Sequence, residues 1–228
     1  MQVAVLCGGL ATRLGPLSRS TPKSMLAING RPFMEHQFKL LSGNGIRDIV
    51  LCVGHFHEQI MDYFGDGSRF GVNIKYSVDG DTLLGTGGAL RRAYPLLDDE
   101  FSVMYGDSYL MLPYENIWRA YRESGKPGLM VVYRNDNRYD RSNLIVRDRR
   151  VVLYDPKHER DDLVFIDEGL TVLKKSVLQS IPENTPFGLG SLFSEMARRG
   201  DLASFETSQR FYEIGSVNGL EELKTVLR

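Results

Sequence analysis

A glycine-rich loop near the start of the chain combines backbone freedom with two cations. The segment 6–25, LCGGLATRLGPLSRSTPKSM, follows an apolar run and contains Gly8, Gly9, Arg13 and Lys23. Backbone N–H groups in such a turn form a concavity that accepts anions, and a guanidinium fork suits phosphate oxygens. Pro22 fixes the backbone before Lys23 and limits where the ammonium can point. The pattern indicates a phosphate-binding loop, and two solvated surface cations are the simpler alternative.

Two familiar phosphate-binding loops do not match this segment. A P-loop closes on Gly-Lys-Ser or Gly-Lys-Thr, and neither follows here. The dinucleotide fingerprint needs glycines in the pattern G-x-G-x-x-G, which GGLATRLG does not supply. We therefore expect neither a P-loop nucleotidase nor a Rossmann oxidoreductase.

A second candidate is the segment 105–110, YGDSYL. Asp107 follows a strand-like run through one glycine, which places a carboxylate at the carboxyl edge of a predicted sheet. Magnesium favours such oxygen ligands and completes its shell with waters and substrate phosphates. An aspartate that only shapes a turn is the alternative. These residues alone leave both readings open.

Alternating strands and helices must position these loops. Apolar, β-rich runs occupy 3–7, 48–53, 72–76 and 101–105, and helical patterns between them lie near 33–41, 58–64 and 87–97. Buried strands separated by amphipathic helices predict a parallel sheet with helices on both faces. Ligands bind such sheets beyond the carboxyl ends of the strands. That rule selects the loops after Cys7 and Val53 together with 83–90, LLGTGGAL, and 105–110.

The second half of the chain has a different pattern. Strand-like runs at 128–134, 143–148, 150–155 and 163–173 have few helices between them, which favours antiparallel strands that extend the sheet. Further helices are predicted near 189–199 and 217–227. Dense charges of mixed sign over 134–162 indicate a solvated hairpin rather than a binding patch. The prediction is an α/β fold, a Rossmann-like mixed and mostly parallel sheet flanked by helices, in a single domain over 1–228.

Composition narrows the function classes. The 228 residues carry a formal net charge of −1, so no basic field favours nucleic acid or a membrane surface as a partner. No apolar run approaches the ~18 residues of a membrane helix, and the first residues do not resemble a signal peptide. Cys7 and Cys52 lie in apolar strands and are expected to be buried thiols, which fits a cytoplasmic protein.

Other residues offer weaker candidates. His55 and His57 could begin a metal site, but no third ligand is evident nearby, and packing at a helix start is the preferred interpretation. Ile117, Trp118 and Tyr121 have the spacing of one helix face and are expected in the core. No serine or cysteine lies in a recognisable nucleophile motif.

The order of these motifs resembles that of a known family. LCGGLATRL followed by TPKSM is similar to the signature G-G-x-x-T-R-L with a later P-K of the sugar-1-phosphate nucleotidylyltransferases. The likeness continues in LLGTGGAL, YGDSYL, DEGLTVL and RFYEIGSVNGL, and so spans essentially the whole chain. The chain most resembles the short bacterial D-glycero-D-manno-heptose 1-phosphate guanylyltransferase type. It contains no hexapeptide repeat, so we do not expect a bifunctional acyltransferase.

The resemblance implies a glycosyltransferase-A-like nucleotidyltransferase fold with a nucleotide-binding half, 1–110, and a sugar-phosphate-binding half, 111–228. Arg13 would bind the pyrophosphate end of the triphosphate, and Lys23 would neutralise charge at the α-phosphate. The other residues implied to contact the nucleotide are Leu6, Gly8, Gly9, Gly85, Thr86, Gly87 and Gly88.

The resemblance also implies a metal and a sugar site. Asp107 would bind Mg²⁺, the expected cofactor. Its partner stands in YEIG, where Glu213 replaces the aspartate usual in the family, so direct ligation by Glu213 is in doubt and a water-mediated contact is the alternative. Glu168 would accept hydrogen bonds from sugar hydroxyls beside Gly169. Lys157 would lie near the sugar phosphate, although proline precedes it here instead of following it.

The implied reaction joins a nucleoside triphosphate and a sugar 1-phosphate into a nucleotide sugar and releases pyrophosphate. GTP and a heptose 1-phosphate are favoured by resemblance only. One alternative is a cytidylyltransferase that acts on phosphocholine or a similar small phosphate, which an acidic and aromatic pocket would favour. Another is a catalytically inactive subunit that binds a nucleotide sugar. The replacement of the family's usual aspartate by Glu213 would support this alternative. Self-association is expected from the family.

Overall fold

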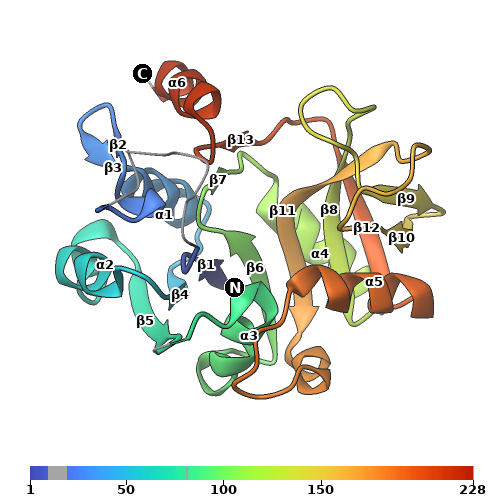
Figure 1. Cartoon of the computed structure of the whole chain (residues 1–228), viewed down its shortest axis with the longest axis horizontal. Coiled ribbons are helices and arrows are strands. Elements are labelled where there is room, and N and C mark those ends of the chain that lie inside the picture. Colours follow the sequence, from blue (N-terminus) through green and yellow to red (C-terminus); the bar gives the residue numbers. More distant parts are fainter. Residues whose placement is uncertain (10–19, 81, 228) are drawn as a thin grey trace.

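The computed structural model describes residues 1–9, 20–80 and 82–227, and Arg13 lies outside these ranges. Within them the chain forms a central sheet of nine strands in the order β5-β4-β1-β6-β11-β8-β12-β10-β9 (Figure 1). These strands are β1 (Gln2–Leu6), β4 (Asp48–Val53), β5 (Asn73–Val78), β6 (Glu100–Tyr105), β8 (Gly128–Arg134), β9 (Leu144–Arg147), β10 (Arg150–Tyr154), β11 (Phe165–Lys174) and β12 (Leu202–Thr207).

The sheet is parallel in its first half and mixed in its second. Strands β5, β4, β1 and β6 pair in parallel, and β11 runs antiparallel to both β6 and β8. The predicted α/β fold with a mixed sheet is confirmed. The sequence analysis did not anticipate β12, which pairs in parallel with β8.

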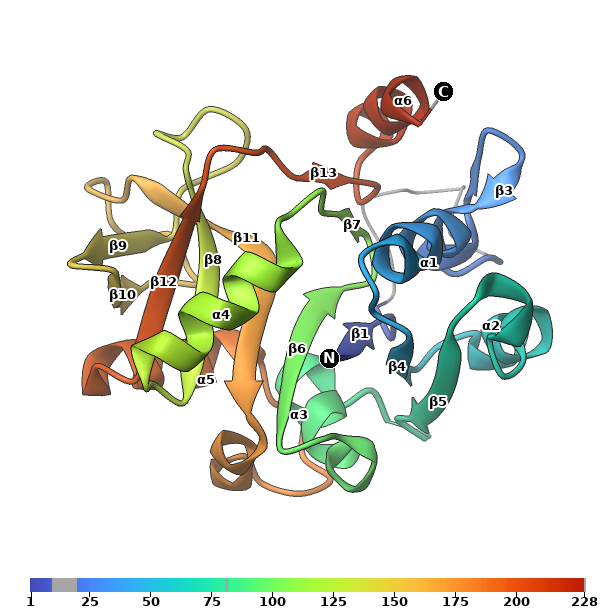
Figure 2. The ribbon, with the colours of Figure 1, turned by 180° about the vertical axis from the view of Figure 1, so that it is seen from behind.

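Helices cover both faces of the sheet. One apolar cluster joins α1 (Phe33–Gly43), α2 (His57–Phe64) and α4 (Tyr114–Ser124) to the sheet, and a second joins α3 (Gly85–Arg92) and α5 (Leu189–Arg199) to the opposite face. Figure 1 shows α3 and α5 in front of the sheet. Figure 2 shows the molecule from behind, where α4 lies in front of the sheet. No helix in the described ranges is long and apolar enough to cross a membrane.

Short elements complete the chain. Short 3₁₀ turns are η2 (Lys23–Met25), η3 (Ser68–Phe70), η4 (Tyr94–Leu96) and η5 (Lys175–Ser180), and the hairpin β2 (Ala27–Ile28) and β3 (Arg31–Pro32) precedes α1. The last helix, α6 (Val217–Val226), packs through Leu220 and Leu223 against Ile28 and Phe33.

One short pairing positions the site. β7 (Ser108–Tyr109) pairs antiparallel with β13 (Tyr212–Glu213), with Glu213 opposite Ser108. The backbone N–H of Ile214 also donates to the Asp107 carbonyl oxygen at 2.9 Å. These contacts bring YGDSYL and YEIG together at the carboxyl edge of the sheet, although they are far apart in the sequence.

Candidate active site

Two cavities meet at the carboxyl end of β6. The first has a volume of about 270 Å³ and the second about 560 Å³, and Tyr105 and Asp107 line both. The candidate residues that line the first cavity are Leu6, Gly8, Gly9, Lys23, Gly85, Thr86 and Asp107. The cavities therefore lie at the edge of the sheet that the strand-end rule selects.

Glycine is required where the backbone segments of the first cavity cross. A Cβ added to Gly106 would lie 2.7 Å from Cys7 Sγ and 2.8 Å from the Leu6 carbonyl oxygen. A Cβ on Gly8 would lie 3.3 Å from the backbone nitrogen of Gly54. Gly9 is exposed, and no described atom lies within 4 Å of the position of its Cβ. The turn after β1 is therefore packed closely at Gly8, and Gly9 lines the first cavity.

The glycines of LLGTGGAL have two different surroundings. Gly85, with φ of 68°, and Thr86 line the first cavity. Gly87 and Gly88 are buried, and their N–H groups donate to the Phe187 carbonyl oxygen at 2.8 and 3.1 Å. A Cβ on Gly87 would lie 2.7 Å from the Phe187 ring. Gly87 and Gly88 thus pack α3 against the segment before α5, while Gly85 and Thr86 face the cavity.

Asp79 holds this segment in place and was missed by the sequence analysis. It follows β5, is 6% exposed, and accepts the N–H of Leu84 at 3.0 Å through Oδ2. Burial raises the pKa of Asp79, while the Leu84 hydrogen bond and the charge of Arg92 oppose that shift. Its position directly after a parallel strand was a usable signal, because the same strand-end rule selects it.

Lys23 and Asp107 form an ion pair where the cavities meet. Lys23 Nζ donates to Asp107 Oδ2 at 2.9 Å, and the two side chains are 18% and 30% exposed. Lys23 begins η2 directly after Pro22, which has a φ of −64°. A cation and a carboxylate, both partly open to solvent, therefore stand together between the two cavities.

Glu213 lies close to this pair but is engaged at the start of α6. Its Oε2 accepts the N–H of Gly215, and its Oε1 accepts the Ser216 hydroxyl at 2.5 Å. Ser216 in turn caps α6 by accepting the N–H of Gly219 at 3.0 Å. The Glu213 carboxylate thus reaches from β13 to the residues that begin α6.

The second cavity contains the predicted sugar-site residues Glu168 and Gly169. The pairing of β11 with β8 is interrupted between Asp167 and Thr171, and Gly169 has a φ of 93°. A β-bulge of this kind redirects a side chain from the regular alternation of a strand. Glu168 is 2% exposed, and neither of its carboxyl oxygens has a hydrogen-bond partner among the described residues.

The acidic pair Asp167 and Glu168 is held in an unusual ionisation state. Burial raises the pKa of Glu168 to about 9, and the neighbouring charge of Asp167 adds to the shift while Arg210 opposes it. Burial also raises the pKa of Asp167 to about 6, although its carboxylate accepts from the Gly169 N–H at 2.9 Å and the Tyr154 hydroxyl at 3.4 Å. Near neutral pH, Glu168 is therefore mainly protonated, and Asp167 ionises more readily than Glu168.

Lys157 stands apart from the other candidates. Its side chain is 78% exposed, its ion-pair partner is Glu159 at 3.8 Å, and it is not among the described residues that line the two cavities. The adjacent His158 lines the second cavity, with Nδ1 3.1 Å from the Ser142 carbonyl oxygen. Among the described candidates, the structure therefore brings all but Gly87, Gly88 and Lys157 together around the cavities, and it leaves Lys157 in solvent.

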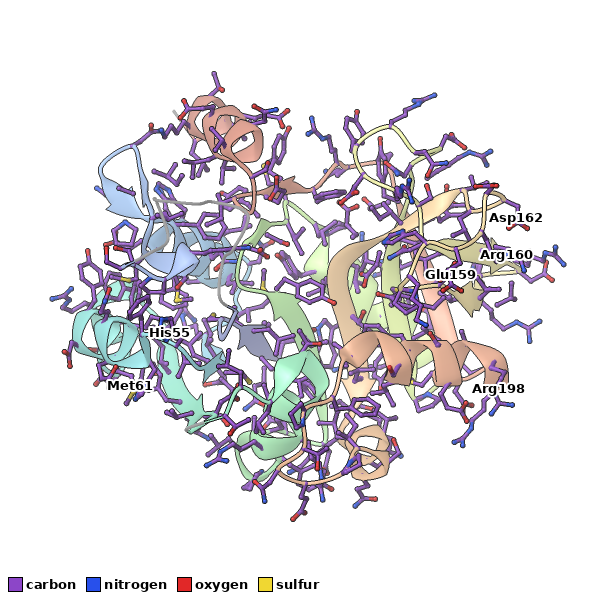
Figure 3. All side chains as sticks on the ribbon, viewed as in Figure 1. His55, Met61, Glu159, Arg160, Asp162 and Arg198 are labelled. Atoms are coloured by element: carbon purple, nitrogen blue, oxygen red, sulfur yellow. The ribbon has the colours of Figure 1, made fainter. Side chains whose placement is uncertain are left out.

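His55 and His57, the weaker candidates for a metal site, make packing and backbone contacts instead. His57 is the first residue of α2, with Nδ1 3.1 Å from the Gly54 carbonyl oxygen, and the His55 ring packs on Phe56. Figure 3 shows His55 beside α2, at the opposite end of the molecule from Arg160 and Asp162. Those two residues form an ion pair of 2.6 Å with both side chains at least half exposed. Other residues of the same charged segment line the second cavity, so the segment is not only a solvated hairpin; they are Tyr139, Asp140, Arg141, Asn143, Tyr154 and His158.

Comparisons with known proteins agree with this geometry. A family model described as nucleotidyl transferase matches residues 2–224. The D-glycero-alpha-D-manno-heptose 1-phosphate guanylyltransferases of Campylobacter jejuni and Aneurinibacillus thermoaerophilus are 29% and 28% identical, over 94% of this chain in each case and over 95% and 93% of the relatives. HddC from Yersinia pseudotuberculosis, solved in complex with GMP-PN, is 25% identical with a TM-score of 0.82 and covers 100% of this chain and 99% of its own.

The family expected from the motifs is therefore confirmed over nearly the full length of the sequence. The fold of the solved relative and the loops that converge on the two cavities agree with that assignment. The chain belongs to the nucleotidyl transferase family.

Proposed function

We propose that this protein transfers a nucleoside monophosphate from a nucleoside triphosphate to a sugar 1-phosphate. The observation that carries the proposal is the Lys23–Asp107 pair at the junction of two cavities. One cavity has the glycine-lined walls of a nucleotide site, and the other has polar side chains suited to an acceptor. A reaction that joins two phosphate-bearing substrates needs this arrangement, with the charged groups at the point where the substrates meet.

The chemistry requires alignment more than proton transfer. A phosphate oxygen of the acceptor attacks the α-phosphorus, the bond from that phosphorus to the bridging oxygen breaks, and pyrophosphate leaves with the electron pair. The acceptor phosphate is already anionic, so no side-chain base is needed. Lys23 would neutralise charge at the α-phosphate, and Arg13 would bind the leaving pyrophosphate.

Leu6, Gly8, Gly9, Gly85 and Thr86 are proposed to bind the nucleotide by lining the first cavity. Gly87 and Gly88 would act indirectly, because their amides hold α3 against Phe187.

Asp107 and Glu213 fit a divalent cation whose shell the substrates complete. A Cβ on Gly215 would lie 2.7 Å from Glu213 Oε2 and 3.4 Å from Asp107 Oδ2, so the two carboxylates flank one backbone position. The described residues contain no cluster of three or more metal-ligating side chains, and Mg²⁺ often uses one or two carboxylates with substrate phosphates. Bound there, Mg²⁺ would neutralise charge on the triphosphate. Asp107 is the proposed direct ligand, and Glu213 the water-mediated one.

The nucleotide and the acceptor are proposed from the relatives. The names of the two heptose 1-phosphate guanylyltransferases favour GTP and a heptose 1-phosphate. Glu168 and Gly169 are the proposed acceptor-binding residues, and Lys157 would reach the acceptor phosphate only by leaving its solvent-exposed position. The free thiols of Cys7 and Cys52 support a reducing, cytoplasmic location.

The test measures pyrophosphate release with each of the four common nucleoside triphosphates and a panel of sugar 1-phosphates. Each reaction is run with Mg²⁺ and with EDTA. We expect release that needs both substrates and Mg²⁺, with GTP the preferred nucleotide. Nucleotide binding without pyrophosphate release from any combination would instead identify a binding subunit.

A further inference from the structure

The second cavity is acidic and aromatic. Its aromatic lining residues are Tyr105, Tyr139, Tyr154 and Phe211. The described lining has more carboxylates than basic side chains, the latter being Arg141 and His158. The carboxylates are Asp107, Asp140, Asp167, Glu168 and Glu213. An anionic acceptor phosphate gains nothing from such a wall, so the wall must serve another part of the acceptor.

Glu168 is the cavity residue whose surroundings point most clearly to a bound ligand. It is 2% exposed and lines the cavity, and neither carboxyl oxygen has a hydrogen-bond partner among the described residues. Leaving a buried polar group unpaired costs about 1–3 kcal/mol and more when it is charged. The bulge at Gly169 keeps it in this place despite that cost. A group on the ligand would supply the missing partner.

The surroundings favour a cationic group as that partner. Asp167 lies next to Glu168 in the chain, and the donors to its carboxylate among the described residues are neutral, from Gly169 and Tyr154. Arg210 lies near the cavity, but it pairs with Glu222 at 2.5 Å and packs 4.0 Å over the Tyr139 ring. Aromatic faces add attraction for a cation. An ammonium donates several hydrogen bonds and carries a positive charge, so it suits two neighbouring carboxyls that line one cavity better than a neutral hydroxyl does.

We infer that the acceptor of this enzyme carries an ammonium group, which the cavity beside β11 binds through Glu168 and Asp167. The inference rests on the proposed nucleotidyl transfer and specifies its acceptor. The phosphate of the acceptor would lie at the Lys23–Asp107 junction and its amine against the acidic wall. Two kinds of molecule have this chemistry, an amino sugar 1-phosphate with a free amine and the phosphate of an amino alcohol. Either would take the place of the neutral heptose 1-phosphate that the names of the relatives suggest.

The first experiment compares matched acceptors with the wild-type protein. Pyrophosphate release is measured with glucosamine 1-phosphate, N-acetylglucosamine 1-phosphate and glucose 1-phosphate, and with phosphoethanolamine, phosphocholine and glycerol 3-phosphate. We expect kcat/KM at least tenfold higher for an amine than for its hydroxyl or acetylated counterpart, the range of a charge-assisted hydrogen bond. If the amine is preferred among the sugar 1-phosphates, the acceptor is an amino sugar phosphate. If it is preferred among the alcohol phosphates, the acceptor is the phosphate of an amino alcohol. Equal or better use of the neutral acceptors overturns the inference and leaves the proposed function standing.

The second experiment assigns the preference to the acidic wall. Glu168→Gln keeps the size of the side chain and removes its ability to ionise, and Asp167→Asn does the same beside it. Each should lower the ratio of kcat/KM for the amine to kcat/KM for its neutral counterpart about tenfold or more, because only the amine loses a charged partner. Glu206→Gln, on the exposed side of β12, is the matched control and should keep the wild-type preference. A preference that survives both cavity variants contradicts the role given to these carboxylates.

Calorimetry separates this inference from the proposed function. Because Glu168 is mainly protonated in the empty protein near neutral pH, binding of an ammonium should ionise it and release a proton. The apparent binding enthalpy of the amine acceptor should then depend on the ionisation enthalpy of the buffer, and this dependence should be lost in Glu168→Gln. If no acceptor supports pyrophosphate release, the proposed function fails. In that case, tighter binding of the amine acceptors than of the neutral ones would still support the inference, and equal binding would overturn it.

Discussion

Lys23 Nζ lies 2.9 Å from Asp107 Oδ2, and this ion pair joins two loops that are 84 residues apart in the sequence. The pair places the proposed phosphate-binding cation beside the proposed metal ligand. A nucleotide with its cation would draw Lys23 to the α-phosphate and leave Asp107 to the metal. The partly exposed pair itself contributes little to stability, because solvent screens it. Its role is therefore to keep both charges at the junction of the cavities.

Asp107→Asn should abolish the response of the initial rate to Mg²⁺. A neutral amide is a much poorer ligand for a hard cation than a carboxylate. The measurement is a Mg²⁺ titration of pyrophosphate release, with Asp62→Asn on the exposed face of α2 as the control. A titration curve that matches the wild type would remove Asp107 from the metal site.

Glu213→Gln should affect stability more than metal dependence. The carboxylate holds the Gly215 N–H and the Ser216 hydroxyl at the start of α6, so its loss should lower the free energy of unfolding by about 1 kcal/mol. Urea unfolding measures this, with Glu123→Gln in α4 as the control. The Mg²⁺ concentration for half-maximal rate should move only a few-fold. A loss of Mg²⁺ response as large as that of Asp107→Asn would make Glu213 a direct ligand.

Gly88→Ala should destabilise the fold even though Gly88 is not among the residues that line the cavities. The added Cβ would lie 2.7 Å from the Thr185 carbonyl oxygen and 2.9 Å from Leu84 Cβ. Overpacking of this kind costs about 1–3 kcal/mol. Gly43→Ala is the matched control, because that glycine ends α1 with no described atom within 4 Å of its Cβ position. Equal urea midpoints for the two variants would show that the segment 185–187 moves aside easily.

Glu168→Gln should make the protein more stable than the wild type at high pH. The pKa of Glu168 is raised from 4.5 to about 9, so between these values the folded state holds a proton that the unfolded state has released. Folding stability therefore falls as pH rises through this window, and the amide variant escapes that loss. Urea midpoints of both proteins from pH 5 to 9 should diverge as pH increases. A difference that does not change with pH would mean that Glu168 is not protonated in the fold.

The sequence predicts the regular elements well because their signals are local. The predicted ranges 48–53, 128–134 and 189–199 coincide with β4, β8 and α5, whose apolar periodicity reflects burial of one strand or helix face. β12 was missed, since its short run LASFET owes its place to pairing with β8. The strand-end rule also located the first cavity, because it depends only on the order of strands and loops.

Features that depend on distant contacts could not be predicted. The bulge that turns Glu168 into the second cavity arises from the register between β11 and β8. The carboxylate of Glu213 binds groups at the start of the following helix α6, and the motif YEIG does not reveal that contact. The packing of Gly88 against Thr185 likewise joins segments almost a hundred residues apart. Each of these is set by tertiary structure rather than by local pattern.

The most direct test of the account is the turnover of Lys23→Ala. Pyrophosphate release at saturating nucleotide, acceptor and Mg²⁺ is compared with wild type and with Lys75→Ala, a control on the exposed side of β5. We predict a normal unfolding transition and a kcat about 10²–10³ lower for Lys23→Ala, the scale for loss of one charge-stabilising donor, with Lys75→Ala unchanged. A purified, folded Lys23→Ala that turns over at the wild-type rate would contradict the placement of nucleotidyl transfer at the Lys23–Asp107 junction.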